Sequence, residues 1–354
     1  MGETMRRHTP TGGVVRAIRG LLFGVATGLV LVAGSMPSQA AEIQGRFGLP
    51  IRCEAGTICV IQQFPDLDPG PGIRDPWCGT ATYDGHDGTD FRVLTMTDMK
   101  AGVPVVAMSD GRVRGGRDGM MDTLVRTDAD RARVADRECG NGVAIDHGEG
   151  VESQYCHLRT GSVKVKPGDI VRKGDPLGLV GASGMAAFPH VHAVVRVNGE
   201  AVDLATGLKA GEACLVSGLQ SLENTLLDAS ARAALPEPGQ PTFLAAGFAA
   251  APVDDRSLVD EGLPAPPDSR SEAFVGYGWV INLAKGDRVK VVVSTDAGQV
   301  FAETTSEPMD RSKAVYTAYA GRKISPPPGL YRVRAEVLRG SGRAASREVA
   351  ITIR

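Results

Sequence analysis

Histidine is scarce in this sequence, with six residues in 354, and several patterns that would direct an interpretation are missing. The helical metalloprotease pattern H-E-x-x-H is absent, and no C-x-x-C pair argues for a zinc ribbon. The apolar run from Leu21 to Ala33 is shorter than the roughly 20 residues that span a bilayer. No basic patch indicates a nucleic-acid partner. These absences remove helical zincins, zinc ribbons and nucleic-acid-binding proteins from consideration.

Residues 1–40 have the pattern of a secretory signal peptide. Four arginines precede the apolar run, and Ser38-Gln39-Ala40 offers small residues at a cleavage site. No lipobox cysteine follows it. We therefore expect cleavage after Ala40 and a mature protein that is periplasmic or secreted and not held in a membrane. An uncleaved membrane anchor is the alternative.

All six cysteines lie beyond this leader, and an even number in an exported chain favours disulfides over metal binding. Six cysteines allow fifteen connectivities. The expected pairs are Cys53–Cys59, Cys139–Cys156 across a hairpin that turns at Gly148-Glu149-Gly150, and Cys78–Cys214.

Four of the six histidines fall in three short motifs, one of which adds an aspartate. The motifs are Gly85-His86-Asp87-Gly88-Thr89-Asp90, Gln154-Tyr155-Cys156-His157-Leu158 and His190-Val191-His192. The third begins an apolar strand, in which residues i and i+2 point to the same face. The first is broken by glycines and favours a loop that enters a strand. Together the motifs supply three metal ligands with an open fourth position and two imidazoles for proton transfer, which is what a hydrolytic zinc site needs.

The stretch from Tyr83 to Asp203 resembles the lysostaphin-type (LytM-like) zinc endopeptidases of bacterial cell walls. The resemblance covers about a third of the chain and rests on the three motifs and on the segments between them. These segments are Val106-Ala107, Asp110–Val113, Gly142–Gly148, Pro167–Val171, Gly174, Gly178–Gly184, Pro189 and Val197–Asp203. Phe188-Pro189 replaces the Gly-Pro common in the family, and the polar stretch Gly115–Gly140 is an insertion.

The resemblance makes His86, Asp90 and His192 the ligands of one zinc ion, with His157 and His190 as catalytic histidines. Two neutral imidazoles and one carboxylate leave the ion a net charge near +1, so it can still polarise a carbonyl. The resemblance also implies a substrate in peptidoglycan cross-link peptides, with cleavage between D-alanine and the side-chain amine of diaminopimelate. We expect the loops 66–84 and 115–140 to select this substrate.

Two other functions share the pattern. Degenerate members of the family are non-enzymatic scaffolds that activate a cell-wall amidase, but they typically lose metal ligands that this chain retains. A secreted bacteriolysin that cleaves the bridges of other cells would use the same site. Outside the site residues, His147 is interpreted as structural, and Cys156 should point away from His157 as part of a disulfide.

Composition divides the mainly β chain into five segments. They are the signal peptide 1–40, a Cys/Pro/Gly-rich extension 41–82, an antiparallel LytM-type zinc peptidase domain 83–206, a helical and Pro-rich linker 207–241, and a small immunoglobulin-like β-sandwich 242–354. In the extension, Asp66, Asp68 and Asp75 indicate a solvated loop that packs on the catalytic domain, with a calcium loop as the alternative. In the linker, the leucine spacing predicts one helix over Ser217 to Leu235. The sandwich is either a module that binds the wall or a protein partner, or a spacer.

Overall fold

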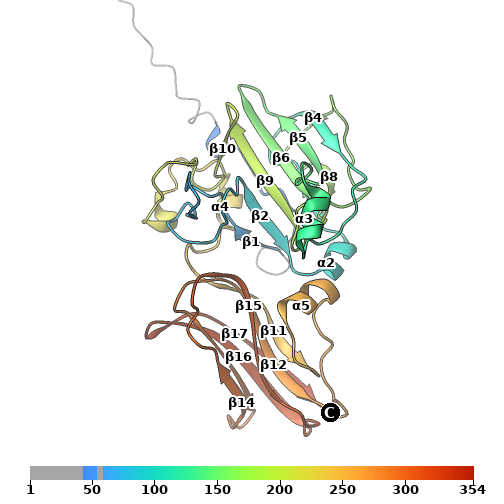
Figure 1. The fold of residues 1–354 in the computed structure, drawn as a ribbon, viewed down its shortest axis with the longest axis vertical. Helices are drawn as coiled ribbons and strands as arrows, with labels where there is room; N and C mark the ends of the chain where they lie inside the picture. Colours follow the sequence, from blue (N-terminus) through green and yellow to red (C-terminus); the bar gives the residue numbers. More distant parts are fainter. Residues whose placement is uncertain (1–42, 54–58) are drawn as a thin grey trace, which may run out of the picture. The chain divides into compact units, whose positions relative to one another are not determined.

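The structure is a computed structural model that describes residues 43–53 and 59–354, so the predicted signal peptide lies outside the described residues. All described residues belong to one compact unit, Ser38–Arg354. Antiparallel strands dominate the described residues (Figure 1), which confirms the mainly β fold class. None of the helices in this described part is both long and apolar enough to cross a membrane.

The first half of the unit is built on an eight-stranded sheet with the order β1-β2-β9-β6-β5-β4-β7, to which β10 adds by pairing with β9. Every neighbouring pair is antiparallel. The strands are β1 Cys59–Gln63, β2 Thr89–Val93, β4 Gly111–Arg117, β5 Asn141–Asp146, β6 Val151–Leu158, β7 Ile170–Val171, β9 His190–Val197 and β10 Glu200–Val202.

The central strand β9 shows how the sheet separates packing from chemistry. Val191, Ala193 and Val195 enter the main apolar cluster, because alternate residues of a strand point to one face. His190 and His192 therefore lie on the opposite face, as their spacing predicts. The strand after the first motif also forms, and it begins early enough to include Asp90.

Short elements surround this sheet. A two-stranded sheet pairs β3 (Pro104–Val106) with β8 (Pro176–Leu179). Helix α2 (Met96–Ala101) follows β2 directly, and the Thr95 side chain caps its first turn. Helix α3 (Asp128–Val134) lies within the predicted insertion, and a capping box of Thr127 and Asp130 stabilises its N-terminus.

The extension before residue 83 packs on the catalytic half, as expected, but the expectation of a solvated loop is wrong for Asp66 and Asp75. Strand β1 pairs along β2 at the edge of the sheet. Asp66 and Asp75 are buried, and each carboxylate accepts hydrogen bonds from three backbone N–H groups. The donors to Asp66 are Asp68, Arg74 and Gly85. The donors to Asp75 are Trp77, Gly79 and Ala81. These donors use the oxygens that a calcium ion would need.

The single helix predicted over 217–235 is also wrong. The chain forms a 3₁₀ turn at Gly218–Ser221 and a four-residue helix α4 at Ala229–Arg232. Between them, Leu226 and Leu227 are buried in an extended segment that hydrogen-bonds to Phe47 and Leu204. The leucines thus pack through strand-like contacts, because a tertiary partner supplies their hydrogen bonds.

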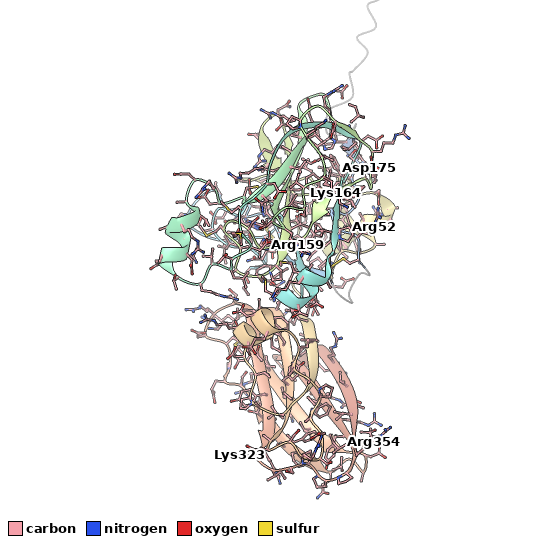
Figure 2. All side chains as sticks on the ribbon, turned by 90° about the vertical axis from the view of Figure 1, so that its right-hand side faces the viewer. Arg52, Arg159, Lys164, Asp175, Lys323 and Arg354 are labelled. Carbon is pink, nitrogen blue, oxygen red and sulfur yellow. A yellow bond between two sulfur atoms is a disulfide. The ribbon has the colours of Figure 1, made fainter. Side chains whose placement is uncertain are left out.

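The second half is a β-sandwich. A three-stranded sheet, β11-β12-β15, packs against a four-stranded sheet, β14-β13-β16-β17, and both contribute to one apolar cluster. Lys323 and Arg354 lie at one end of it (Figure 2). The immunoglobulin-like type stays a prediction. The elements are β11 Thr242–Ala249, α5 Asp255–Glu261, β12 Phe274–Leu283, β13 Arg288–Thr295, β14 Val300–Thr305, β15 Lys313–Arg322, β16 Gly329–Arg339 and β17 Gly342–Ile353.

All three expected disulfides are present, Cys53–Cys59, Cys78–Cys214 and Cys139–Cys156. The second closes a long stretch of chain, with a sequence separation of 136, whereas the first spans 6. A longer closed loop removes more conformational entropy from the unfolded chain. Cys78–Cys214 is therefore expected to contribute most to stability.

Replacing Cys78 and Cys214 together by serine should lower the free energy of unfolding by about 5 kcal/mol, against about 2 kcal/mol for the matched Cys53→Ser, Cys59→Ser variant. Guanidinium denaturation of both variants, followed by circular dichroism, measures the two losses. Equal losses would show that loop length does not govern these bonds.

Candidate metal centre

The pairing of β2 with β9 places Asp90 directly opposite His192. His86 reaches the same point from the loop before β2. Its Nε2 lies 3.1 Å from Asp90 Oδ1 and 3.1 Å from His192 Nδ1, and the latter two atoms are 2.9 Å apart. All three side chains are buried. The structure therefore brings together the three residues that the sequence nominated as metal ligands.

The outer hydrogen bonds of the two histidines show that this cluster fits a metal ion. His86 Nδ1 donates to the carbonyl of Phe64 at 2.7 Å, which leaves Nε2 with its lone pair. His192 Nε2 lies 3.1 Å from Asp87 Oδ1, which leaves Nδ1 to face the cluster. Three acceptor atoms thus converge and need a proton or a cation between them. Ligand atoms around a tetrahedral zinc ion, at about 2.0–2.2 Å from the metal, are separated by roughly 3.3 Å, close to the spacing here.

The pKa values reflect the same convergence. Burial opposes ionisation of Asp90, but His86, His190 and His192 outweigh it and hold its pKa well below the usual value. Burial also lowers the pKa of His192, yet the hydrogen bonds and charges of Asp87 and Asp90 raise it to about 9. In the metal-free protein at neutral pH, the positive charge of protonated His192 therefore offsets the negative charges of Asp87 and Asp90.

Asp87 was quoted within the first motif but not assigned a role. Burial raises its pKa, and its hydrogen bond with His192, together with the charge of Arg196, lowers it to about 2. Arg196 Nη2 donates to the other carboxylate oxygen at 2.6 Å. A carboxylate on the outer nitrogen of a metal-binding histidine fixes its ring and raises its basicity. No spacing in the sequence distinguished Asp87 from an ordinary loop acid.

His157 and His190 complete the cluster. Their ring centroids are 4.5 Å apart, and His157 lies 6.0 Å from His192. Each donates Nδ1–H to a main-chain carbonyl, that of Ser183 at 2.7 Å for His157 and that of Phe188 at 2.8 Å for His190. Both Nε2 atoms are left as proton acceptors. His190 Nε2 is 3.5 Å from Asp90 Oδ1.

Both imidazoles are held in the neutral form. Burial lowers the pKa of His157 well below the usual value, and the nearby His190 and His192 lower it further. Burial also lowers the pKa of His190, although Asp90 acts in the opposite direction. Near neutral pH these side chains can therefore accept a proton, as a general base must.

The expectation that Cys156 points away from His157 was wrong. His157 has a φ of +63°, so the alternation of β6 ends there and both residues line the same cleft. The Cys139–Cys156 bridge forms part of the cleft wall, and the His157 amide donates to the carbonyl of Cys139 at 2.8 Å. Cys156 is nevertheless structural, since its sulfur is in a disulfide.

This cleft has a volume of about 330 Å³ and passes His86, His157 and His192. The two loops expected to select the substrate both reach it. Tyr83 comes from the first loop and Glu138 from the second. The Tyr83 ring lies 4.4 Å from that of His86 and is half exposed.

His147 stands apart from the cleft, as expected. Its Nδ1 contacts the carbonyl of Asp110 at 2.6 Å and its Nε2 the hydroxyl of Ser153 at 2.7 Å. Burial lowers its pKa. With both nitrogens bonded, this histidine serves to pack the sheet.

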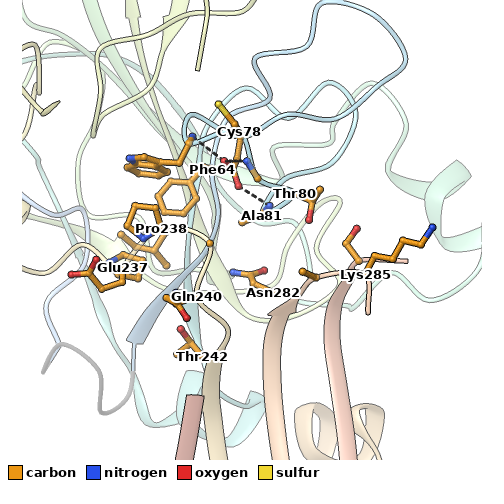
Figure 3. A pocket seen from close by; sticks show the side chains of 18 of the residues that line it. Phe64, Cys78, Thr80, Ala81, Glu237, Pro238, Gln240, Thr242, Asn282 and Lys285 are labelled. Carbon is orange, nitrogen blue, oxygen red and sulfur yellow. Dashed lines mark hydrogen bonds between the residues drawn. The ribbon is translucent and has the colours of Figure 1, made fainter. Parts of the chain in front are cut away.

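A second cavity, of about 480 Å³, lies between the extension and the start of the sandwich (Figure 3). Phe64, Pro238 and Asn282 line it. Phe64 lies between this cavity and the metal centre. Its side chain lines the cavity, and its carbonyl accepts the hydrogen bond of His86 Nδ1. None of the five nominated residues lines this cavity, so it is separate from the metal centre.

Comparison with known proteins gives consistent matches over this half of the chain. Two curated relatives are similar to it: an uncharacterized metalloprotease of Haemophilus influenzae, 31% identical over 155 residues (43% of this chain and 26% of that protein), and the peptidoglycan DD-endopeptidase ShyB of Vibrio cholerae, 30% identical over 118 residues (33% and 22%). The matched stretch thus spans about a quarter of the length of these relatives.

Among solved structures, a zinc-containing peptidase from Vibrio cholerae is 26% identical, with a TM-score of 0.30, and the match covers 49% of this chain and 41% of that chain. The family model of Peptidase family M23 matches residues 84–204, the stretch that contains all five nominated residues. Residues 84–204 are thus a domain of Peptidase family M23.

Proposed function

We propose that the protein is an exported zinc metalloendopeptidase that hydrolyses peptide bonds in peptidoglycan cross-links. The observation that carries the proposal is the convergence of His86 Nε2, Asp90 Oδ1 and His192 Nδ1 within 3.1 Å of one another, with two neutral histidines beside them. In this assignment the first three residues hold one zinc ion. His157 and His190 are the catalytic histidines.

Zinc, when bound, polarises the scissile carbonyl and lowers the pKa of a coordinated water. The chain's own residues supply the proton transfers. His157 and His190 each present Nε2 as an acceptor, because their Nδ1–H groups are held by main-chain carbonyls. They take a proton when the nucleophile forms and return one to the leaving amine. Asp90 stabilises His190 while it carries that proton.

The proposed substrate is the bond between D-alanine and the side-chain amine of diaminopimelate. Support comes from the name of a relative, a peptidoglycan DD-endopeptidase. It also comes from the narrow cleft, which has room for a small flexible peptide. Tyr83 and Glu138 at its walls belong to the loops that we expect to select this peptide.

The amidase-activating scaffold is the less favoured function, because the described structure retains the whole donor set with its outer hydrogen bonds. A bacteriolysin would use the same residues and differs in the cell wall attacked. Export accords with three disulfides in the folded chain, since such bonds form in oxidising compartments.

Alanine at His86, Asp90 or His192 should abolish the binding of one zinc ion per chain, because two donors hold zinc far more weakly than three. Alanine at His157 or His190 should keep the metal and lower turnover by about 10²–10⁴-fold. Elemental analysis and hydrolysis assays on the five variants separate the two groups. Full zinc content in all three variants of the first group would refute the ligand assignment.

Zinc binding should release about one proton at pH 7, because His192 is protonated below its pKa of about 9 in the metal-free protein. The share of this release that comes from His192 should fall towards zero as the pH rises through 9, while the metal-bound water adds a proton of its own at alkaline pH. Calorimetric titration in two buffers with different protonation enthalpies measures the proton count. Asp87→Asn is the matched control and should shift this fall to lower pH. The same proton count in wild type and Asp87→Asn at every pH would contradict the site described here.

Zinc-loaded protein incubated with purified sacculi should convert cross-linked muropeptide dimers to monomers, as detected by mass spectrometry. His157→Ala serves as the inactive control. If the muropeptides stay unchanged while an added amidase is stimulated, the scaffold function replaces the peptidase.

A further inference from the structure

Arg92 is a buried cation that the proposed chemistry does not use. It is 1% exposed, and within the described part of the chain no carboxylate forms an ion pair with it. Its Nη1 donates to Gln62 Oε1 at 2.7 Å and its Nη2 to the carbonyl of Leu94 at 3.3 Å. Burial lowers the pKa of Arg92 to about 9, and Asp255 opposes this only from beyond ion-pair distance. A buried charge without a carboxylate in contact is costly and calls for an explanation.

The guanidinium is held between two aromatic rings. Its central carbon lies 4.6 Å from the ring centroid of Phe188 and 4.7 Å from that of Trp279. Trp279 is fully buried and belongs to β12 of the sandwich. A guanidinium between aromatic faces is attracted to both, and more strongly where water is excluded. Trp279, Arg92 and Phe188 thus form a continuous stack from the sandwich to the catalytic half.

The stack ends on a catalytic histidine. The Phe188 ring lies 4.6 Å from the His190 ring, and the Phe188 carbonyl receives the Nδ1–H of His190 at 2.8 Å. In the β2–β9 pairing, Arg92 is also the direct partner of His190. Phe188 therefore contacts the His190 imidazole in two ways: its ring packs on the imidazole ring, and its carbonyl accepts the Nδ1–H hydrogen bond.

A second contact from the sandwich holds the same loop. Arg126 Nη1 donates to the carbonyl of Ala187 at 2.9 Å, and its Nη2 donates to Asp260 Oδ1 at 2.6 Å. Asp260 lies on α5, which follows the first strand of the sandwich. The residues just before His190 are thus tied to the sandwich through two independent arginines.

We propose that the β-sandwich is a positioning element of the catalytic centre, in which Trp279 presses Arg92 onto Phe188 and so fixes the imidazole of His190. The inference rests on the proposed function, because it gives His190 a catalytic role. Arg92 and Trp279 are positioning residues, since neither lines the cleft and the hydrogen bonds of Arg92 go to Gln62 and Leu94. The sandwich is then required for turnover itself and is not only a spacer or a binding module.

The test compares zinc-loaded full chains carrying Trp279→Leu, Trp279→Phe and, as the matched control, Phe274→Leu. Phe274 is equally buried, but it packs in the apolar cluster between the two sheets of the sandwich, whereas Trp279 packs in a separate cluster with Leu94 and Leu258. Trp279→Leu should lower kcat by about 10²-fold with little change in KM and in zinc content, because misplacing a catalytic group by about 1 Å costs that much. Trp279→Phe keeps an aromatic face and should restore most of kcat. Equal kcat in wild type and Trp279→Leu, or an equal loss in Phe274→Leu, would overturn the proposal.

Arg92→Met tests the stack if Trp279→Leu does not fold. It fills the space with an apolar side chain and removes a buried charge that is costly to desolvate, while Gln62 Oε1 loses one donor. We expect the variant to fold, to bind zinc and to lose kcat in the same proportion. A folded Arg92→Met with unchanged kcat would reject the stack as a positioning device.

A readout without substrate separates this inference from the proposed function. In ¹⁵N-histidine spectra of the zinc-loaded chain, Trp279→Leu and Arg92→Met should shift the Nδ1–H signal of His190, because its Phe188 contact changes. The signal of His147, hydrogen-bonded to a carbonyl elsewhere, should stay in place as an internal control. If the wild-type protein fails to cleave sacculi, the proposed function is wrong, but these spectra still test whether the stack positions the His190 ring. An unchanged His190 signal overturns the inference.

Discussion

The register of β2 against β9 is the constraint on which the rest of the site depends. It pairs Asp90 with His192 and Arg92 with His190, so two of the metal-binding side chains and the buried stack arise from the same ladder. A slip of one residue would turn every side chain of β2 to the other face of the sheet. The apolar packing of Phe91 and Val191 opposes such a slip, because both are buried in the core on the far side.

Main-chain carbonyls then orient the imidazoles. Phe64, Ser183 and Phe188 each accept a ring N–H from a different histidine. These carbonyls come from loops and from the end of the edge strand, not from the strands that carry the histidines. The sheet therefore sets where the rings of His157 and His190 are, and the loop before β2 places His86. The carbonyls set which nitrogen of each ring is free to react.

The family resemblance nominated the five residues of the site, and local spacing predicted which elements carry them. The i, i+2 pair His190 and His192, the loop-to-strand position of His86 and Asp90, and the hairpin that carries the Cys139–Cys156 bond all follow from periodicity or turn chemistry. Asp87 and Arg92 could not be found in this way, because their roles depend on contacts with Arg196 and Trp279, far away in the sequence. The extended leucines near residue 226 were misinterpreted for the same reason, since their hydrogen-bond partner Phe47 is about 180 residues away.

The shape of the cleft depends on the oxidation state of the Cys139–Cys156 disulfide beside His157. Cys139 supplies both a sulfur to the bridge and a carbonyl to the His157 amide, so reduction would loosen the backbone that turns this ring towards the cleft. In a reducing compartment the chain would carry every reactive group and still lack a finished wall around them. Oxidation therefore completes this side of the cleft, and the bond that does so forms only where the surroundings are oxidising.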